Sequence, residues 1–168
     1  VLAGFLHVLK DDGFAYIRVP DMAELMRTVV RDGRDIEDVL YQSPAGPIAV
    51  STLKEAEQFL EHGVTDILYA VGIAPGKLEH VQSLRDRGAD LAVVVDSVEA
   101  AQAVAARGAG IPALIEIDCD GHRAGVKPGH PVLLDIAKAL ARGAQPRGVM
   151  THAGDSYNCR TVEAIADM

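Results

Sequence analysis

Residues 51–63, STLKEAEQFLEHG, decide the fold, because a second copy of their pattern follows at residues 96–108, DSVEAAQAVAARG. Thr52 and Ser97 are favourable helix N-caps, and Glu55, three residues after Thr52, completes a capping box. A glycine closes each copy, at the position where a left-handed C-terminal cap belongs. Each copy lies between two short apolar runs, so the repeat predicts strand–helix–strand units.

The chain from residue 47 onward continues this alternation. Strands are expected near residues 47–50, 67–71, 91–95, 113–118 and 148–151, and further helices over Pro75–Arg87 and Pro131–Arg142. Such uniformly apolar strands are typical of a parallel sheet that is buried on both faces. About five βα units fit either an open doubly wound α/β sheet or part of a (β/α)8 TIM-type barrel, and the pattern alone does not separate the two.

Residues 1–45 lack this rhythm. Two apolar runs flank Lys10–Gly13, which ends in Asp-Gly and predicts a hairpin turn, and a short helix is expected over Met22–Arg31. We therefore expect a boundary near residue 45. It separates an N-terminal hairpin-and-helix segment of unassigned role from a barrel domain over residues 46–168.

Composition limits the possible partners. A formal net charge of -8 argues against nucleic acid or an anionic membrane surface as the main partner. No apolar stretch reaches the roughly 20 residues of a membrane span. Cys119 and Cys159 lie in unrelated contexts and are expected to be free thiols in a reducing compartment. Because no export signal is recognisable, a cytoplasmic location is expected.

Two apolar runs end abruptly in polar side chains: residues 114–126, LIEIDCDGHRAGV, and residues 149–157, VMTHAGDSY. The carboxyl ends of parallel strands are where α/β proteins bind ligands. The first run supplies Arg123 and the second supplies His152 and Tyr157, so the three are candidate site residues.

Each candidate also has a structural interpretation when the residues are taken alone. Arg123 could form an ion pair with Asp118 or Asp120. His152 could be a packed, hydrogen-bonded core histidine, and Tyr157 could be an aromatic residue at the rim.

Four motifs occur together and in one order: AVSTLKEAE at 49–57, DILYAVG at 66–72, IEIDCDGHRAGV at 115–126 and THAGDSY at 151–157. With them the chain resembles the N-terminal barrel of the fold-type III pyridoxal-phosphate enzymes, the alanine racemase superfamily. It is most similar to the branch that contains D-threonine aldolase and D-serine dehydratase. The resemblance covers about three quarters of the chain.

The resemblance implies a cofactor site. Arg123 would lie near the phenolic oxygen of pyridoxal phosphate, where a guanidinium favours the phenolate. His152 would lie against the cofactor ring and Tyr157 would reach into the pocket, which makes both catalytic as well as cofactor-binding. A divalent metal, zinc or manganese, would assist, with ligands outside this chain; no metal ligand is therefore assigned here.

The implied activity is that of a pyridoxal-phosphate-dependent lyase acting on small D-β-hydroxy amino acids, as a D-serine dehydratase or D-threonine aldolase. Since these enzymes generally dimerise, a homodimer is expected. The alternatives are an amino-acid racemase of the same superfamily and a non-catalytic barrel that binds the cofactor or a partner. An unrelated (β/α)8 sugar-phosphate enzyme is less favoured, because no late glycine-rich phosphate loop occurs.

The resemblance is incomplete at both ends of the chain, most clearly at the cofactor-binding lysine. The cofactor-binding lysine of the family lies in a Pro-His-x-Lys-Thr-x-Lys motif on the first barrel strand, and residues 1–46 contain no such motif. The nearest sequence, HVLK at His7–Lys10, has different spacing. We therefore expect the sequence to be an incomplete record of a longer enzyme.

Overall fold

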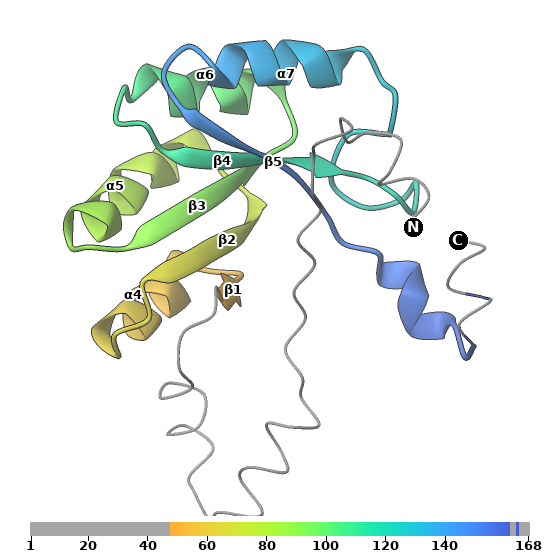
Figure 1. The fold of residues 1–168 in the computed structure, drawn as a ribbon, viewed down its shortest axis with the longest axis horizontal. Coiled ribbons are helices and arrows are strands. Elements are labelled where there is room, and N and C mark those ends of the chain that lie inside the picture. The colour runs from red at the N-terminus through yellow and green to blue at the C-terminus, as the bar shows by residue number, and fades with distance from the viewer. Residues whose placement is uncertain (1–47, 162–163, 165–168) are drawn as a thin grey trace, which may run out of the picture.

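A computed structural model describes residues 48–161 and residue 164 (Figure 1). The hairpin and helix predicted within residues 1–45, the boundary near residue 45, and Lys10 lie outside these residues. The described elements, in chain order, are β1 (Ile48–Val50), α4 (Leu53–Glu61), β2 (Asp66–Gly72), the 3-10 helix η1 (Pro75–Lys77), α5 (Leu78–Asp86), β3 (Asp90–Val95), α6 (Val98–Ala106), β4 (Pro112–Ile117), α7 (Val132–Leu140), β5 (Gln145–Thr151) and the 3-10 helix η2 (Gly154–Asn158).

The five strands form one parallel sheet in the order β1-β2-β3-β4-β5. Helices α4 to α7 cover one side of the sheet and follow one another in chain order, as the strands do (Figure 1). A doubly wound sheet reverses its strand order and carries helices on both faces, whereas a (β/α)8 barrel adds each unit beside the last. The strand order and the helix placement therefore exclude the open doubly wound sheet and identify part of a TIM-type barrel.

Local signals in the sequence account for the helix ends. The Thr52 hydroxyl accepts a hydrogen bond from the Glu55 N–H at 3.1 Å, and the Glu55 carboxylate accepts from the Thr52 N–H at 2.8 Å. Ser97 caps α6 in the same way through the N–H of Ala100. Gly63 and Gly108, which follow α4 and α6, have φ angles of +86° and +63°. The predicted capping pattern is confirmed.

The core lies between the helix layer and the sheet. Its buried members on the strands include Ile67, Tyr69, Leu91, Val93, Val95, Ala113 and Ile115. In β3 every residue after Asp90 is buried, as the apolar pattern predicted. In β1, β2 and β5, however, exposed and half-buried residues occur, so the expectation of uniformly buried strands is wrong for these three. In the predicted strand 148–151, Gly148 is exposed and the next three residues are half-buried.

Among the described residues, none of the helices combines the length and the apolar character needed to cross a bilayer. Within the part of the chain that the structure describes, Cys119 and Cys159 form no disulfide, as the sequence predicted.

Candidate functional site at the carboxyl ends of β4 and β5

The two polar motifs meet because β4 and β5 are neighbouring parallel strands. Ile117 and Thr151, the last residues of the two strands, are paired in register. The Thr151 hydroxyl donates a hydrogen bond to the Ile117 carbonyl at 2.8 Å. Each strand is followed by a polar segment, the loop of residues 118–125 after β4 and the turn of residues 152–155 after β5. Both segments therefore begin at the same edge of the sheet.

The loop after β4 folds back onto its own strand. The N–H of Asp118 donates to the Val126 carbonyl at 3.1 Å, and the N–H of Val126 donates to the Glu116 carbonyl at 2.9 Å. Inside the loop, the buried Asp118 carboxylate accepts from the Gly121 N–H at 2.9 Å. The loop that carries Arg123 is thus closed at its base and braced within.

Cys119 lies half-buried between the two segments. Its thiol donates to the Asp120 carboxylate at 3.2 Å and lies 3.8 Å from the His152 carbonyl oxygen. The Thr151 hydroxyl lies 3.0 Å from its sulfur. Burial raises the pKa of the Cys119 thiol above its ordinary value, and the neighbouring Asp120 carboxylate adds to this. A thiol in this state is a packing and hydrogen-bonding group and a poor nucleophile at neutral pH.

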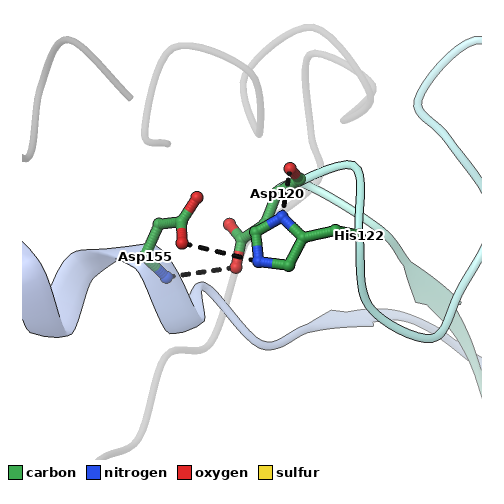
Figure 2. A group of neighbouring side chains, drawn as sticks. All are labelled: Asp120, His122 and Asp155. Atoms are coloured by element: carbon green, nitrogen blue, oxygen red, sulfur yellow. Dashed lines mark hydrogen bonds and ion pairs between the residues drawn. The ribbon is translucent and has the colours of Figure 1, made fainter.

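Three side chains with metal-ligand atoms lie together at this edge: Asp120 and His122 from the loop after β4, and Asp155 from the start of η2 (Figure 2). Their ligand atoms all lie within 4.8 Å of one another. His122 Nε2 lies 3.5 Å from an Asp155 carboxylate oxygen, and its Nδ1 lies 3.0 Å from the Asp120 carbonyl oxygen. Because a carbonyl oxygen only accepts, Nδ1 carries a proton. Two carboxylates and an imidazole are ligand types that suit zinc or manganese.

Asp120 is the best connected of the three. One carboxylate oxygen accepts from the Asp155 N–H at 3.2 Å and the other from the Cys119 thiol. The Cys119 hydrogen bond, followed by those from the N–H groups of Asp155 and Gly154, lowers the pKa of the Asp120 carboxyl. This carboxylate therefore ties the loop after β4 to the turn after β5.

Two of the three predicted site residues fall on these two segments, and the third follows the second segment in η2. Arg123 is exposed in the loop, and His152 is half-buried directly after β5. Tyr157 belongs to η2, and the structure describes its backbone but not its side chain. Within residues 48–161, Arg123 forms no ion pair with Asp118 or Asp120. The structure thus brings the segments of Arg123 and His152 into contact through Asp120 and Cys119.

Glu116 was missed by the sequence reasoning. It is 4% exposed on β4, and its Oε2 atom has no hydrogen-bond partner among the described residues. Burial raises the pKa of its carboxyl; Asp96 and Asp118 raise it further, and Arg123 opposes the shift. One signal was available, namely a charged residue between two isoleucines in an otherwise apolar strand. Because side chains alternate between the two faces of β4, Glu116 lies on the face opposite the helix layer.

The alanine racemase N-terminal domain family matches residues 32–166. D-threo-3-hydroxyaspartate dehydratase of Delftia sp. (strain HT23) is 48% identical over 148 residues, which cover 83% of this chain and 39% of that protein. D-serine dehydratase of Dictyostelium discoideum is 31% identical over 134 residues, which cover 72% of this chain and 34% of that protein. The chain therefore spans about two fifths or less of the length of these relatives.

Solved structures agree with the sequence comparisons. The Delftia dehydratase superposes with a TM-score of 0.72 at 42% identity, covering 86% of this chain and 43% of that one. D-threonine aldolase from Filomicrobium marinum superposes with a TM-score of 0.53 at 31% identity, covering 63% of this chain and 30% of that one. Since the family match spans most of the sequence, the chain belongs to the alanine racemase N-terminal domain family of fold-type III pyridoxal-phosphate enzymes, with dehydratases and an aldolase of D-amino acids among its relatives.

Proposed function

We propose that this chain forms the cofactor-binding part of a barrel in a pyridoxal-phosphate-dependent lyase that acts on D-β-hydroxy amino acids, with dehydration as its reaction. The observation that carries the proposal is the 48% identity with a D-threo-3-hydroxyaspartate dehydratase over 83% of the chain. The contact between the ends of β4 and β5 supports the proposal. This contact places the segment that carries Arg123 and the segment that carries His152 at one edge of the sheet.

The residues at this edge have the chemistry that pyridoxal phosphate requires. Arg123 is a permanent cation on a loop that is braced at its base, as a partner for the phenolic oxygen would need to be. His152 offers a half-buried ring beside the strand end, suited to stacking on a flat heterocycle. When bound, the cofactor withdraws electrons from the substrate Cα.

The roles of the chain's own side chains follow from this placement. Arg123 holds the phenolic oxygen in its anionic form by charge and hydrogen bonding. His152 would pack against the cofactor ring. For Tyr157, the THAGDSY motif supports a role in holding or moving a proton at the substrate.

A divalent metal is part of the proposal, with ligands outside this chain. A variant of a D-threo-3-hydroxyaspartate dehydratase has been solved in a metal-free form, which indicates that this relative ordinarily holds a metal. We also propose a homodimer, as membership of the fold-type III enzymes implies. Two cysteines without a disulfide between them support a cytoplasmic location. The domain boundary near residue 45 stays a proposal.

Product analysis tests the function. The full-length enzyme that contains this chain would be purified with pyridoxal phosphate and Mn²⁺ and given D-threo-3-hydroxyaspartate or D-serine. Dehydration removes water across Cα–Cβ, and hydrolysis of the resulting imine returns it, so one 2-oxo acid and one ammonia form per substrate. Glycine with an aldehyde would indicate an aldolase, and the L-isomer a racemase. Cofactor binding with none of these products would support a non-catalytic barrel.

Arg123 offers a matched pair of variants for the same assay. Replacing it with Gln removes the charge beside the proposed phenolic oxygen, and we expect kcat/KM to fall roughly 100-fold, the cost of losing one electrostatic donor in an active site. Arg123→Lys retains the charge without the fork geometry and should lose less. Equal activity of the parent and both variants would remove Arg123 from the site.

A further inference from the structure

We propose that Asp120 is a positioning residue, whose carboxylate holds the turn of residues 152–155 and thereby sets the orientation of the His152 ring. The inference rests on the proposed function, because it gives His152 a cofactor ring to face. It extends that function to a residue on a different strand end, 35 positions away from the Asp155 N–H that it binds.

The contacts around the Asp120 carboxylate carry the proposal. One oxygen accepts from the Asp155 N–H at 3.2 Å. The other oxygen accepts from the Cys119 thiol at 3.2 Å. A single side chain thus binds a backbone N–H of the turn after β5 and a thiol of its own loop at the same time.

Gly154 lies next to both the Asp120 carboxylate and the His152 ring. A Cβ atom built on Gly154 would lie 3.4 Å from an Asp120 carboxylate oxygen and 3.6 Å from His152 Cδ2. The space beside Gly154 is therefore bounded by Asp120 on one side and by the His152 ring on another. A shift of the carboxylate would move the Asp155 N–H that it holds, and with it the turn that follows His152.

A metal site is the competing interpretation of the same side chains (Figure 2). Two observations favour the positioning role. Both oxygens of Asp120 already accept hydrogen bonds from the protein. His122 and Asp155 have side chains that are 64% and 48% exposed, which is open to water for a dedicated cation site. The structure accounts for Asp120 without an ion.

Substitutions of Asp120 test the role in the purified protein with pyridoxal phosphate bound. Asp120→Ala removes every acceptor, and Asp120→Asn retains one oxygen for the turn while losing the charge. A misplaced catalytic group typically costs on the order of 100-fold, so we expect kcat to fall roughly 30- to 100-fold in Asp120→Ala, with KM changed less than about 3-fold. Asp120→Asn should lie between this variant and the parent.

The spectroscopic readout is the visible circular dichroism of the bound cofactor, which reports how its ring sits in the asymmetric site. The band should weaken or change sign in Asp120→Ala and recover in part in Asp120→Asn. The control is Asp135→Ala, an exposed carboxylate on α7 that pairs only loosely with Lys138 at 3.9 Å. It should leave kcat and the band unchanged.

The outcomes separate this inference from the proposed function. A parent protein that binds no pyridoxal phosphate refutes the function. An active parent with unchanged kcat and dichroism in Asp120→Ala refutes the positioning role alone. Loss of folding in both Asp120 variants would assign the residue to stability and overturn the proposal. So would Mn²⁺ binding by the parent that is abolished in both Asp120→Asn and Asp155→Asn.

Discussion

Asp118 and Val126 close the loop that carries Arg123: the N–H of Asp118 donates to the Val126 carbonyl at 3.1 Å. Val126 returns a hydrogen bond to the Glu116 carbonyl and forms an isolated bridge with Ile117. The loop therefore starts at the end of β4 and returns to β4 at Val126. Its closure holds Arg123 next to the strand end although the side chain itself is exposed.

This closure depends on a glycine. Gly125 has a φ of +112°, and a Cβ there would lie 2.7 Å from the Asp118 nitrogen and 2.9 Å from the Ile117 carbonyl carbon. We expect Gly125→Ala to lower the free energy of unfolding by about 2–4 kcal/mol, from backbone strain and overlap together. Chemical denaturation followed by far-UV circular dichroism measures the change.

The control for that substitution lies in the same loop. Gly121 has a φ of +78° but nothing within 4 Å of the added Cβ. Gly121→Ala should therefore cost about 1 kcal/mol, the left-handed backbone term alone. Equal effects of the two substitutions would show that the close approach of Gly125 to β4 does not matter.

A second glycine sets the distance between α6 and α7. A Cβ on Gly143 would overlap the Ala105 carbonyl oxygen, which is backbone and has little freedom to move. We expect Gly143→Ala to lower the melting temperature and to cost about 1–3 kcal/mol. Gly76 has open space around it and no positive φ, so a near-neutral effect of Gly76→Ala is the matched comparison. A melting curve for Gly143→Ala that matches the parent's would contradict this account.

Glu116 predicts a pH dependence of stability. Its pKa is raised in the folded protein above the ordinary value of 4.5, so the folded state holds the proton more tightly than the unfolded state. The stability gained in this way is fully present below pH 4.5 and is lost as the pH rises through the folded pKa. We expect the free energy of unfolding to decline over that interval.

Glu116→Gln should remove this decline, because an amide of similar shape does not titrate. At neutral pH we expect it to be more stable than the parent by on the order of 1 kcal/mol, since no buried carboxylate is left without a partner. Denaturant unfolding from pH 4 to pH 8 measures both curves, and Glu79→Gln, an exposed position on α5, controls for the lost charge. A glutamine variant that is less stable at neutral pH would refute the prediction.

Cys119 is expected to resist alkylation. Burial raises the pKa of its thiol above the ordinary 9.0, so the thiolate fraction at pH 7–8 is small. Iodoacetamide labelling, followed by peptide mass spectrometry, should be slower at Cys119 than at free cysteine and should accelerate only above pH 9.0. Asp120→Asn, which removes the neighbouring negative charge, should accelerate it. Fast labelling of Cys119 at pH 7 would contradict the buried, hydrogen-bonded placement.

Much of the fold could be predicted because its signals are local. Thr52 and Ser97 cap their helices through N–H groups three residues away, and Gly63 ends α4 within the same stretch. All five predicted strands exist, with bounds that differ by three residues at most, at the start of β5. That difference arises at residues 145–147, QPR, which are polar and exposed and carry no apolar period.

The candidate site could be predicted only in part. Arg123 and His152 were identified because each follows an apolar run, which is a one-dimensional pattern. Glu116 was missed, since its burial depends on which face of β4 turns inward. The bond from the Asp155 N–H to Asp120 joins residues 35 apart, and neither residue alone predicts it.

The sequence by itself determined the alternation of strands and helices, the capped helix ends, the family and the strand ends where the polar motifs lie. The alternation, the caps and the strand ends follow from hydrophobic period and from hydrogen bonds between near neighbours, whereas the family follows from four motifs in a fixed order. The tertiary structure alone decided that the strands lie in the order β1-β2-β3-β4-β5, which makes the sheet part of a barrel. It also decided that Ile117 pairs with Thr151, and so which polar groups meet. Strand pairing is a contact between distant segments, and its geometry exists only once the chain is packed.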